Sequence, residues 1–211
     1  RQTRMRIRQS CMYTYLATRV KSWFPTLYLN PPTQHILSIK EWIAETAKKS
    51  GQSQGIYTRI YPAQSVELLP PHSIYAQPHP EFGSQLYEYP EAFVANLEDT
   101  YVIGPDGYVV SSDRRLMVES TWGLWFIAQQ AYPLQRPYLK RLQHKQGVYA
   151  TLAMPWSNSY YHWFLDALPR LALLEAVGEA ERPLIISRFG GSVEGYRRES
   201  LELLGIPPAH R

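Results

Sequence analysis

The last part of the chain alternates short apolar runs with helical patterns, and this alternation constrains the fold more than any other feature. The apolar runs at 148–153 and 183–187 have the length of buried strands. Helical patterns follow them at 158–177 and 194–204, and glycines stand at the ends of both. Strand–helix–strand–helix with short connections predicts two parallel strands joined by a right-handed crossover. The fold class expected here is therefore α/β.

The first of these helices carries a polar stripe. His162, Asp166 and Arg170 follow one another at intervals of four residues, so a helix places them on one face. An apolar stripe runs beside them and consists of Phe164, Leu168 and Leu171. A polar stripe beside a buried face is the arrangement expected of the wall of an active site.

A structural role for the same residues is the alternative. Asp166 followed four residues later by Arg170 is an ordinary surface ion pair, worth about 0.3–0.5 kcal/mol. On this interpretation Asn158 is the N-cap of the helix and Tyr161 is a packing residue. Pro169 lies inside the pattern, where a proline costs ~3 kcal/mol and predicts a bend in the helix.

The residues at 158–171, NSYYHWFLDALPRL, resemble the NxYYHWxxDxxPRL signature of family 61 glycosyltransferases, a family associated with capsular polysaccharide biosynthesis. Upstream, YEYPEAFVAN at 87–96 and then GPDG at 104–107 resemble the region that precedes this signature in the same enzymes. The resemblance extends over roughly residues 60–211. Two matches in the same order are more specific than one.

This resemblance implies a fold. Family members have a GT-B-type architecture, in which two Rossmann-like domains enclose the active site. Residues 60–211 are then expected to be the Rossmann-like first half, with a β-hairpin section, and residues 1–59 a basic, partly helical N-terminal extension. The second domain is expected after Arg211, and residues 1–211 alone are expected to have no transferase turnover.

The resemblance also implies a reaction, the transfer of a sugar from a nucleotide-sugar donor to a glycan or other hydroxyl acceptor, with inversion. Such a transfer needs a base for the acceptor hydroxyl and positive groups for the departing diphosphate. His162 and Asp166 are the candidate catalytic residues, and either is the base or Asp166 orients His162. The candidate substrate-binding residues are Asn158 and Tyr161 for the sugar, and Arg170 for phosphate unless it pairs with Asp166.

No cofactor is expected, because the nucleotide sugar is a substrate. No metal site is expected either, because the six histidines are scattered and no cysteine or carboxylate cluster accompanies them.

Two other functions remain open. His162 and Asp166 also have the HxxxD spacing of CoA-dependent acyltransferases, but those motifs usually lie in a loop and continue with glycine, whereas Ala167 follows here. The chain is alternatively a truncated, inactive module that binds a glycan or a protein partner.

Local signals predict further elements. Residues 38–50 have the pattern of a helix with Ser38 as N-cap and Gly51 as C-cap. The turn sequence GPDG between 101–103 and 108–110 predicts a β-hairpin, with 93–95 as a partner strand. Six prolines between 62 and 90 predict an extended, irregular stretch.

Charge is unevenly distributed along the chain. Residues 1–40 contain seven basic residues and no acid, whereas the whole chain carries +4, which leaves −3 for residues 41–211. An acidic body argues against nucleic acid as the main partner. The basic arm is either a solvated tail, which we favour, or a weak contact with a membrane surface. A single cysteine and the lack of an apolar run of ~18 residues fit a cytoplasmic protein, peripheral to the membrane if the arm binds lipid.

Overall fold

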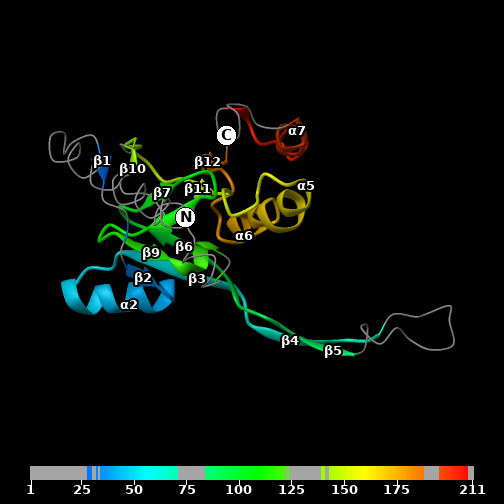
Figure 1. The fold of residues 1–211 in the computed structure, drawn as a ribbon, viewed down its shortest axis with the longest axis horizontal. Helices are drawn as coiled ribbons and strands as arrows, with labels where there is room; N and C mark the ends of the chain where they lie inside the picture. The colour runs from blue at the N-terminus through cyan, green and yellow to red at the C-terminus, as the bar shows by residue number, and fades with distance from the viewer. Residues whose placement is uncertain are drawn as a thin grey trace, which may run out of the picture.

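The structure is a computed structural model that describes residues 28–29, 32, 34–70, 84–121, 123, 139–140, 143–187 and 195–208. These residues form a mixed α/β fold of several small sheets and few helices (Figure 1). Residues 1–27, which make up most of the predicted basic arm, lie outside the described residues. The prediction of an α/β fold is confirmed at this coarse level.

The largest sheet in the described part has four strands in the order β2-β9-β8-β7. Its strands are β2 (Gln34–Ile36), β7 (Tyr101–Ile103), β8 (Tyr108–Val110) and β9 (Arg115–Met117). β7 and β8 form the predicted hairpin, in which Tyr101 lies opposite Val110. Both glycines of its turn adopt positive φ, 76° at Gly104 and 64° at Gly107, which explains why the turn needs them. β2 pairs with β9 in parallel.

The predicted N-terminal helix is confirmed as α2 (Ile39–Ser50). The Ser38 hydroxyl accepts a hydrogen bond from the Glu41 N–H at 3.3 Å, and Gly51 closes the helix in the left-handed conformation. Trp42 and Ile43 pack in one apolar cluster with Met117 of β9. The carboxylate of Glu119, in the short 3-10 helix η2 (Val118–Thr121), accepts from the Ile39 N–H at 2.6 Å. The helix is therefore joined to the four-stranded sheet.

A long antiparallel ribbon follows α2. Its inner half pairs β3 (Gly55–Tyr61) with β6 (Ala92–Leu97), and its outer half pairs β4 (Gln64–Leu68) with β5 (Gln85–Tyr89). The two halves are separated by Pro62 and Ala63 on one strand and by Pro90 and Glu91 on the other, and neither proline has an N–H for the ladder. The expected irregular stretch is thus partly a regular ribbon. The expected domain boundary between residues 59 and 60 falls inside β3.

The prediction that residues 93–95 pair with the hairpin is wrong. Phe93 lies opposite Arg59 and Ala95 lies opposite Tyr57, both in β3. The strand at 55–61 was not recognised in the sequence. β6 forms its hydrogen bonds with this strand and not with the hairpin.

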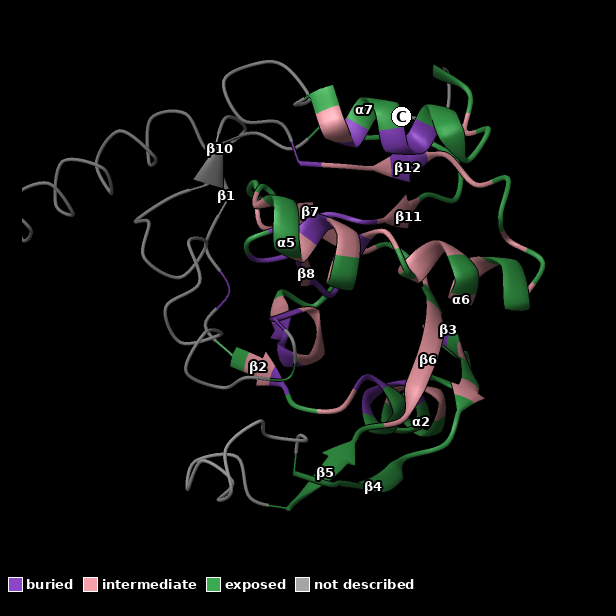
Figure 2. Cartoon of the chain, turned by 90° about the vertical axis from the view of Figure 1, so that its right-hand side faces the viewer, coloured by how far each residue is buried: buried purple, intermediate pink, exposed green. Residues whose placement is uncertain are grey.

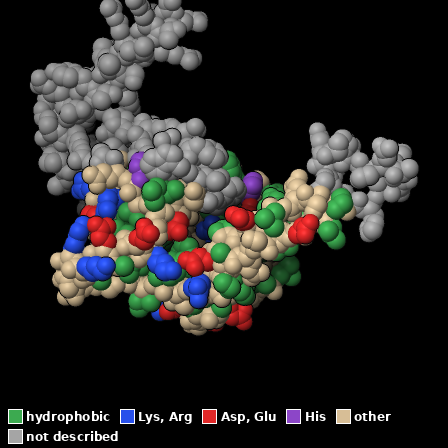
Figure 3. All heavy atoms as spheres, turned by 90° about the horizontal axis from the view of Figure 1, so that it is seen from below, with side chains coloured by type: hydrophobic (Ala, Val, Ile, Leu, Met, Phe, Trp, Pro, Cys, Tyr) green, Lys and Arg blue, Asp and Glu red, His purple; other side chains and the backbone are tan. Residues whose placement is uncertain are grey.

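The outer ribbon projects away from the body of the molecule (Figure 1), and every residue of β4 and β5 is exposed. One face is apolar, since Val66 lies opposite Tyr87 and its neighbours on that face include Leu68 and Tyr89. The opposite face carries Glu67 and Glu88. Figure 3 shows hydrophobic and acidic side chains together on this projection.

The parallel pair predicted near the end of the chain is confirmed. β11 (Ala150–Thr151) lies parallel to β12 (Leu184–Ile185), with Ala150 opposite Leu184. Helical segments lie between the two strands, and α7 (Gly195–Leu203) follows the second. Both strands are shorter than the apolar runs that predicted them. One more pair, β1 (Tyr28–Leu29) with β10 (Leu139–Lys140), is antiparallel.

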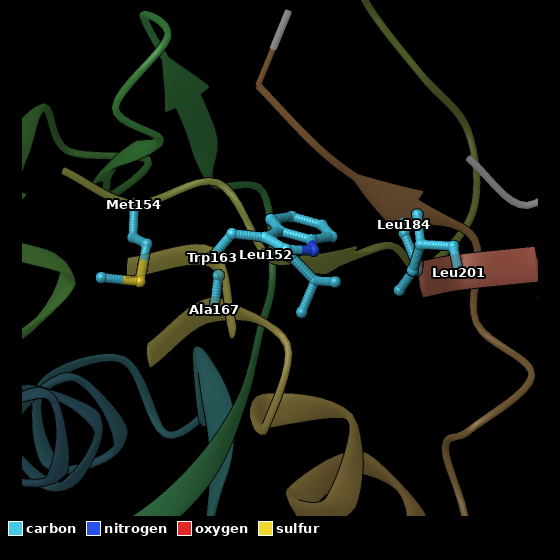
Figure 4. Packing of buried hydrophobic residues seen from close by; sticks show 6 residues of the cluster. All are labelled: Leu152, Met154, Trp163, Ala167, Leu184 and Leu201. Atoms are coloured by element: carbon cyan, nitrogen blue, oxygen red, sulfur yellow. The ribbon is translucent and has the colours of Figure 1, made fainter. Parts of the chain in front are cut away.

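An apolar core holds this second part of the molecule together. Figure 2 shows β11, β12 and α7 gathered on one side of the described residues, away from α2. The indole of Trp163 lies in the middle of the core, with Met154 on one side and Leu184 of β12 and Leu201 of α7 on the other (Figure 4). Its buried companions are Leu152, Met154, Ala167, Leu184 and Leu201.

The hairpin turn fits closely against the segment that follows β11. A Cβ atom added to Gly107 would lie 2.2 Å from the carbonyl oxygen of Ala153. We expect Gly107→Ala to destabilise the protein by about 2–4 kcal/mol, because it adds overpacking to an unfavourable positive φ. Urea unfolding measures the loss.

Gly178→Ala is the matched control, since Gly178 has a φ of 74° and open space around it. Its free energy of unfolding should fall by only about 1–2 kcal/mol, because the alanine has an unfavourable positive φ but no steric clash. Equal losses in the two variants would contradict the close contact between the hairpin turn and Ala153.

Candidate functional site

The signature segment is helical but not uniformly α-helical. It begins as α5 (Tyr160–His162), widens into the π-helical turn η3 (Trp163–Ala167) and continues as α6 (Arg170–Ala176). The Leu168 N–H donates to the Trp163 carbonyl at 2.8 Å, five residues back. Pro169 follows directly and has no N–H to offer an α-helical turn. At the position of the predicted bend the structure has a π-turn, a feature found often at functional sites.

The expected N-cap is wrong by one residue. The Ser159 hydroxyl accepts the hydrogen bond of the His162 N–H at 3.4 Å, so Ser159 caps α5. Asn158 is exposed, and its main-chain carbonyl accepts from the Tyr196 hydroxyl at 2.7 Å. The Asn158 side chain therefore does not cap the helix, as the sequence had suggested.

The structure brings the two candidate catalytic residues together. His162 Nδ1 lies 2.7 Å from Asp166 Oδ2, and the two side chains are 27% and 37% exposed. Because a carboxylate only accepts, the shared hydrogen belongs to Nδ1, and this assignment makes Nε2 the basic nitrogen of the neutral ring. An acid that fixes the tautomer of a histidine is the arrangement of a general base and its orienting group.

Arg170 lies next to this pair, but its guanidinium does not form the expected ion pair with the Asp166 carboxylate. Its Nε donates to the main-chain carbonyl of Asp166 at 3.3 Å, while the Asp166 carboxylate bonds to His162. Burial lowers the pKa of Arg170, and the nearby Asp166 charge opposes that shift. The expected side-chain ion pair between Asp166 and Arg170 is therefore replaced by a bond to the backbone of the π-turn.

Two aromatic side chains flank the imidazole. The ring of Trp156 lies 5.6 Å from that of His162 at an interplanar angle of 31°, and the ring of Tyr161 meets it edge-on at 5.2 Å. Tyr161 is 63% exposed, so the prediction that it is a packing residue is wrong. Trp156 is 47% exposed and was missed in the sequence. Its place in the loop that follows β11 was the available signal.

Buried serines hold the loop that carries Trp156. The Ser187 hydroxyl donates to the Pro105 carbonyl of the hairpin turn and lies 3.1 Å from the Ser157 hydroxyl, which must then be the donor of that second bond. The Met154 N–H donates to the Ser157 hydroxyl at 3.4 Å. This network joins the carboxyl ends of β11 and β12, the edge at which open α/β sheets bind ligands.

The same edge carries a further acidic group. Asp106 lies in the hairpin turn, next to Pro105 and Gly107, which contact Ser187 and Ala153 respectively. Burial raises the pKa of Asp106, and a hydrogen bond from Tyr108 partly offsets this shift. The sequence identified this residue only as part of a turn.

Within the described residues, no group of three or more histidine, cysteine or acidic side chains is placed to hold a metal ion. None of the helices in that part of the chain is long and apolar enough to cross a membrane. Comparison with protein-family models, with curated proteins and with solved structures finds no match to this chain.

Proposed function

We propose that this chain belongs to an inverting glycosyltransferase, which moves a sugar from a nucleotide-sugar donor to a glycan or other hydroxyl acceptor in polysaccharide biosynthesis. The observation that carries the proposal is the His162–Asp166 hydrogen bond of 2.7 Å, set beside a π-turn in the string that resembles the signature of family 61. His162 is the base and Asp166 orients it.

In this proposal the reaction is the one that the resemblance implies, and the His162–Asp166 pair supports it. Nε2 of His162 takes the proton from the acceptor hydroxyl as its oxygen attacks the anomeric carbon of the donor sugar. The bond from that carbon to the phosphate oxygen breaks, and the nucleoside diphosphate leaves with its electron pair. The Asp166 carboxylate stabilises the imidazolium that forms. Attack opposite the leaving group inverts the anomeric carbon.

The finer description of the fold is part of the same proposal. The parallel pair of β11 and β12, with helices between and after the strands, supports the first half of a Rossmann-like domain. The proposal also includes a cytoplasmic location and, through the basic arm, a weak contact with a membrane surface.

A non-enzymatic glycan-binding module is the second candidate, because exposed aromatic rings such as Trp156 and Tyr161 suit sugar binding without any chemistry. The CoA-dependent acyltransferase is less well supported. His162 and Asp166 lie in a helical segment that continues with Ala167, whereas the acyltransferase motif is expected in a loop followed by glycine.

The test is a reaction of the full-length gene product with a panel of nucleotide sugars and neutral glycan acceptors. We expect acceptor-dependent release of a nucleoside diphosphate from at least one donor, and a product whose anomeric configuration, read by NMR, is opposite to that of the donor. Acetyl-CoA with the same acceptors is the control for acyl transfer. Glycan binding without nucleotide release from any donor would favour the binding module, and acetylation would favour the acyltransferase.

A further inference from the structure

We infer that Trp156 binds the acceptor by stacking on one face of a sugar ring, so that the acceptor of this site is a glycan and not a lipid or protein hydroxyl. The inference rests on the proposed function and names its substrate class. Trp156 is then a substrate-binding residue beside the base.

The position of Trp156 supports this role. Its ring lies 5.6 Å from the imidazole of His162 and is tilted by only 31°. In the inferred complex, a sugar ring stacks on the indole beside the imidazole and directs a hydroxyl at its rim toward Nε2. The C–H groups on one face of a pyranose form an apolar surface that suits an aromatic ring, while its hydroxyls point outward to polar partners.

The backbone of Trp156 supports the same conclusion. Its φ of 61° is left-handed, a conformation that costs a non-glycine residue free energy. The Trp156 residue is 47% exposed, so about half of its surface is open to a molecule in solution. The buried bond between Ser157 and Ser187 and the Ser159 N–H donating to the Trp156 carbonyl at 2.8 Å hold the turn in place. Strain of this kind, fixed by its surroundings, is common at ligand sites.

Tyr161 completes the arrangement on another side of the imidazole. Its ring meets the His162 ring at 87°, with 5.2 Å between the centroids, and it is exposed. The two aromatic rings therefore limit how the imidazole can turn, and the Tyr161 hydroxyl is available to a bound sugar.

The stacked ring belongs to the acceptor because of what the base does. His162 removes a proton from the attacking hydroxyl, so the molecule next to it is the one that carries this hydroxyl. A nucleobase of the donor would also stack on an indole, and this alternative predicts a different kinetic result.

Initial rates of the full-length gene product test the inference. We expect Trp156→Ala to raise the KM for a neutral oligosaccharide acceptor by about tenfold. The KM for the donor and the slow hydrolysis of the donor without acceptor should stay within about twofold of the parent. Trp156→Phe keeps a flat ring and should retain most of the affinity. A rise in donor KM instead of acceptor KM, an unchanged acceptor KM, or a fall in kcat alone would overturn the inference.

A binding measurement separates failure of this inference from failure of the proposed function. Residues 1–211 labelled with 5-fluorotryptophan are titrated with maltose, cellobiose, xylobiose and chitobiose, with uridine as the nucleoside control. The Trp156 signal is assigned from its loss in Trp156→Phe. A shift with a disaccharide but not with uridine supports sugar stacking even if no donor reacts. Sugar transfer by the full-length gene product, together with a Trp156 signal that no disaccharide moves, rejects the inference and leaves the proposed function standing.

Discussion

Replacing His162 by alanine in the full-length gene product is expected to lower kcat by about 10²–10⁴-fold, because the reaction loses its general base. Asp166→Ala should also lower kcat, since the carboxylate that accepts from Nδ1 at 2.7 Å fixes the ring and stabilises its charged form. Neither variant should change the free energy of unfolding by more than about 1 kcal/mol, because both side chains are partly exposed. Initial rates and urea unfolding of the same preparations give both quantities.

The chain offers a matched control for this pair. Glu45 and Lys49 are also four residues apart on a helix and form an exposed ion pair at 2.5 Å, with no candidate site around them. Lys49→Ala should change stability by under about 1 kcal/mol and leave the transfer rate at the parent value. If His162→Ala and Asp166→Ala behave like Lys49→Ala, the signature segment is architectural and the base lies elsewhere.

Trp163→Ala is expected to be the most destabilising of the substitutions considered, with a loss of about 3–5 kcal/mol. Trp163 is fully buried, its indole N–H donates to the Ser200 hydroxyl at 2.9 Å, and the Arg197 guanidinium lies over its ring at 5.6 Å. Removing the ring opens a cavity between the strands and α7, takes away the donor to Ser200 and ends the cation–π contact with a buried arginine. Urea unfolding measures the free energy.

Trp156→Ala is the control for this variant, because it removes the same side chain from an exposed position. Its free energy of unfolding should fall by less than that of Trp163→Ala, since Trp156 is 47% exposed and therefore loses less buried surface. Equal losses from the two tryptophans would contradict the assignment of Trp163 to the centre of the core.

The elements that follow local rules could be predicted from the sequence. Ser38 and Gly51 bound α2 because a serine cap and a left-handed glycine act within one turn of the helix. The GPDG turn produced the hairpin for the same reason, and the contact of His162 with Asp166 follows from a spacing of four residues. The parallel pair followed from the alternation of apolar runs and helices.

Elements that depend on contacts between distant residues could not be predicted in this way. The isoleucines, tyrosines and threonine of β3 favour a strand, but its pairing with β6 joins residues more than 30 positions apart and so could not be predicted from local rules. The buried face of the signature segment centres on Trp163 and Ala167, whereas Phe164, Leu168 and Leu171 are only partly buried. The π-turn adds one residue to a helical turn and so rotates the helix relative to a uniform α-helical pattern.

The residues of the candidate site also divide into those that a local pattern reveals and those that depend on distant contacts. His162, Asp166 and Arg170 were found because they are neighbours on one segment. Trp156 was not found, since its place beside His162 depends on a left-handed backbone and on the serines that join β11, β12 and the hairpin turn. Residues that are more than 80 positions apart, such as Ser187 and Pro105, meet only in the folded chain.

The most direct test of His162 as the base is chemical rescue of His162→Ala in the full-length gene product. The rate of sugar transfer is measured as the concentration of added imidazole increases, with the parent and Asp166→Ala as references. Imidazole should enter the space left by the side chain, accept a hydrogen bond from the acceptor hydroxyl and raise the rate of His162→Ala, while it leaves the other two rates unchanged. Transfer by His162→Ala at the parent rate without imidazole would contradict the account.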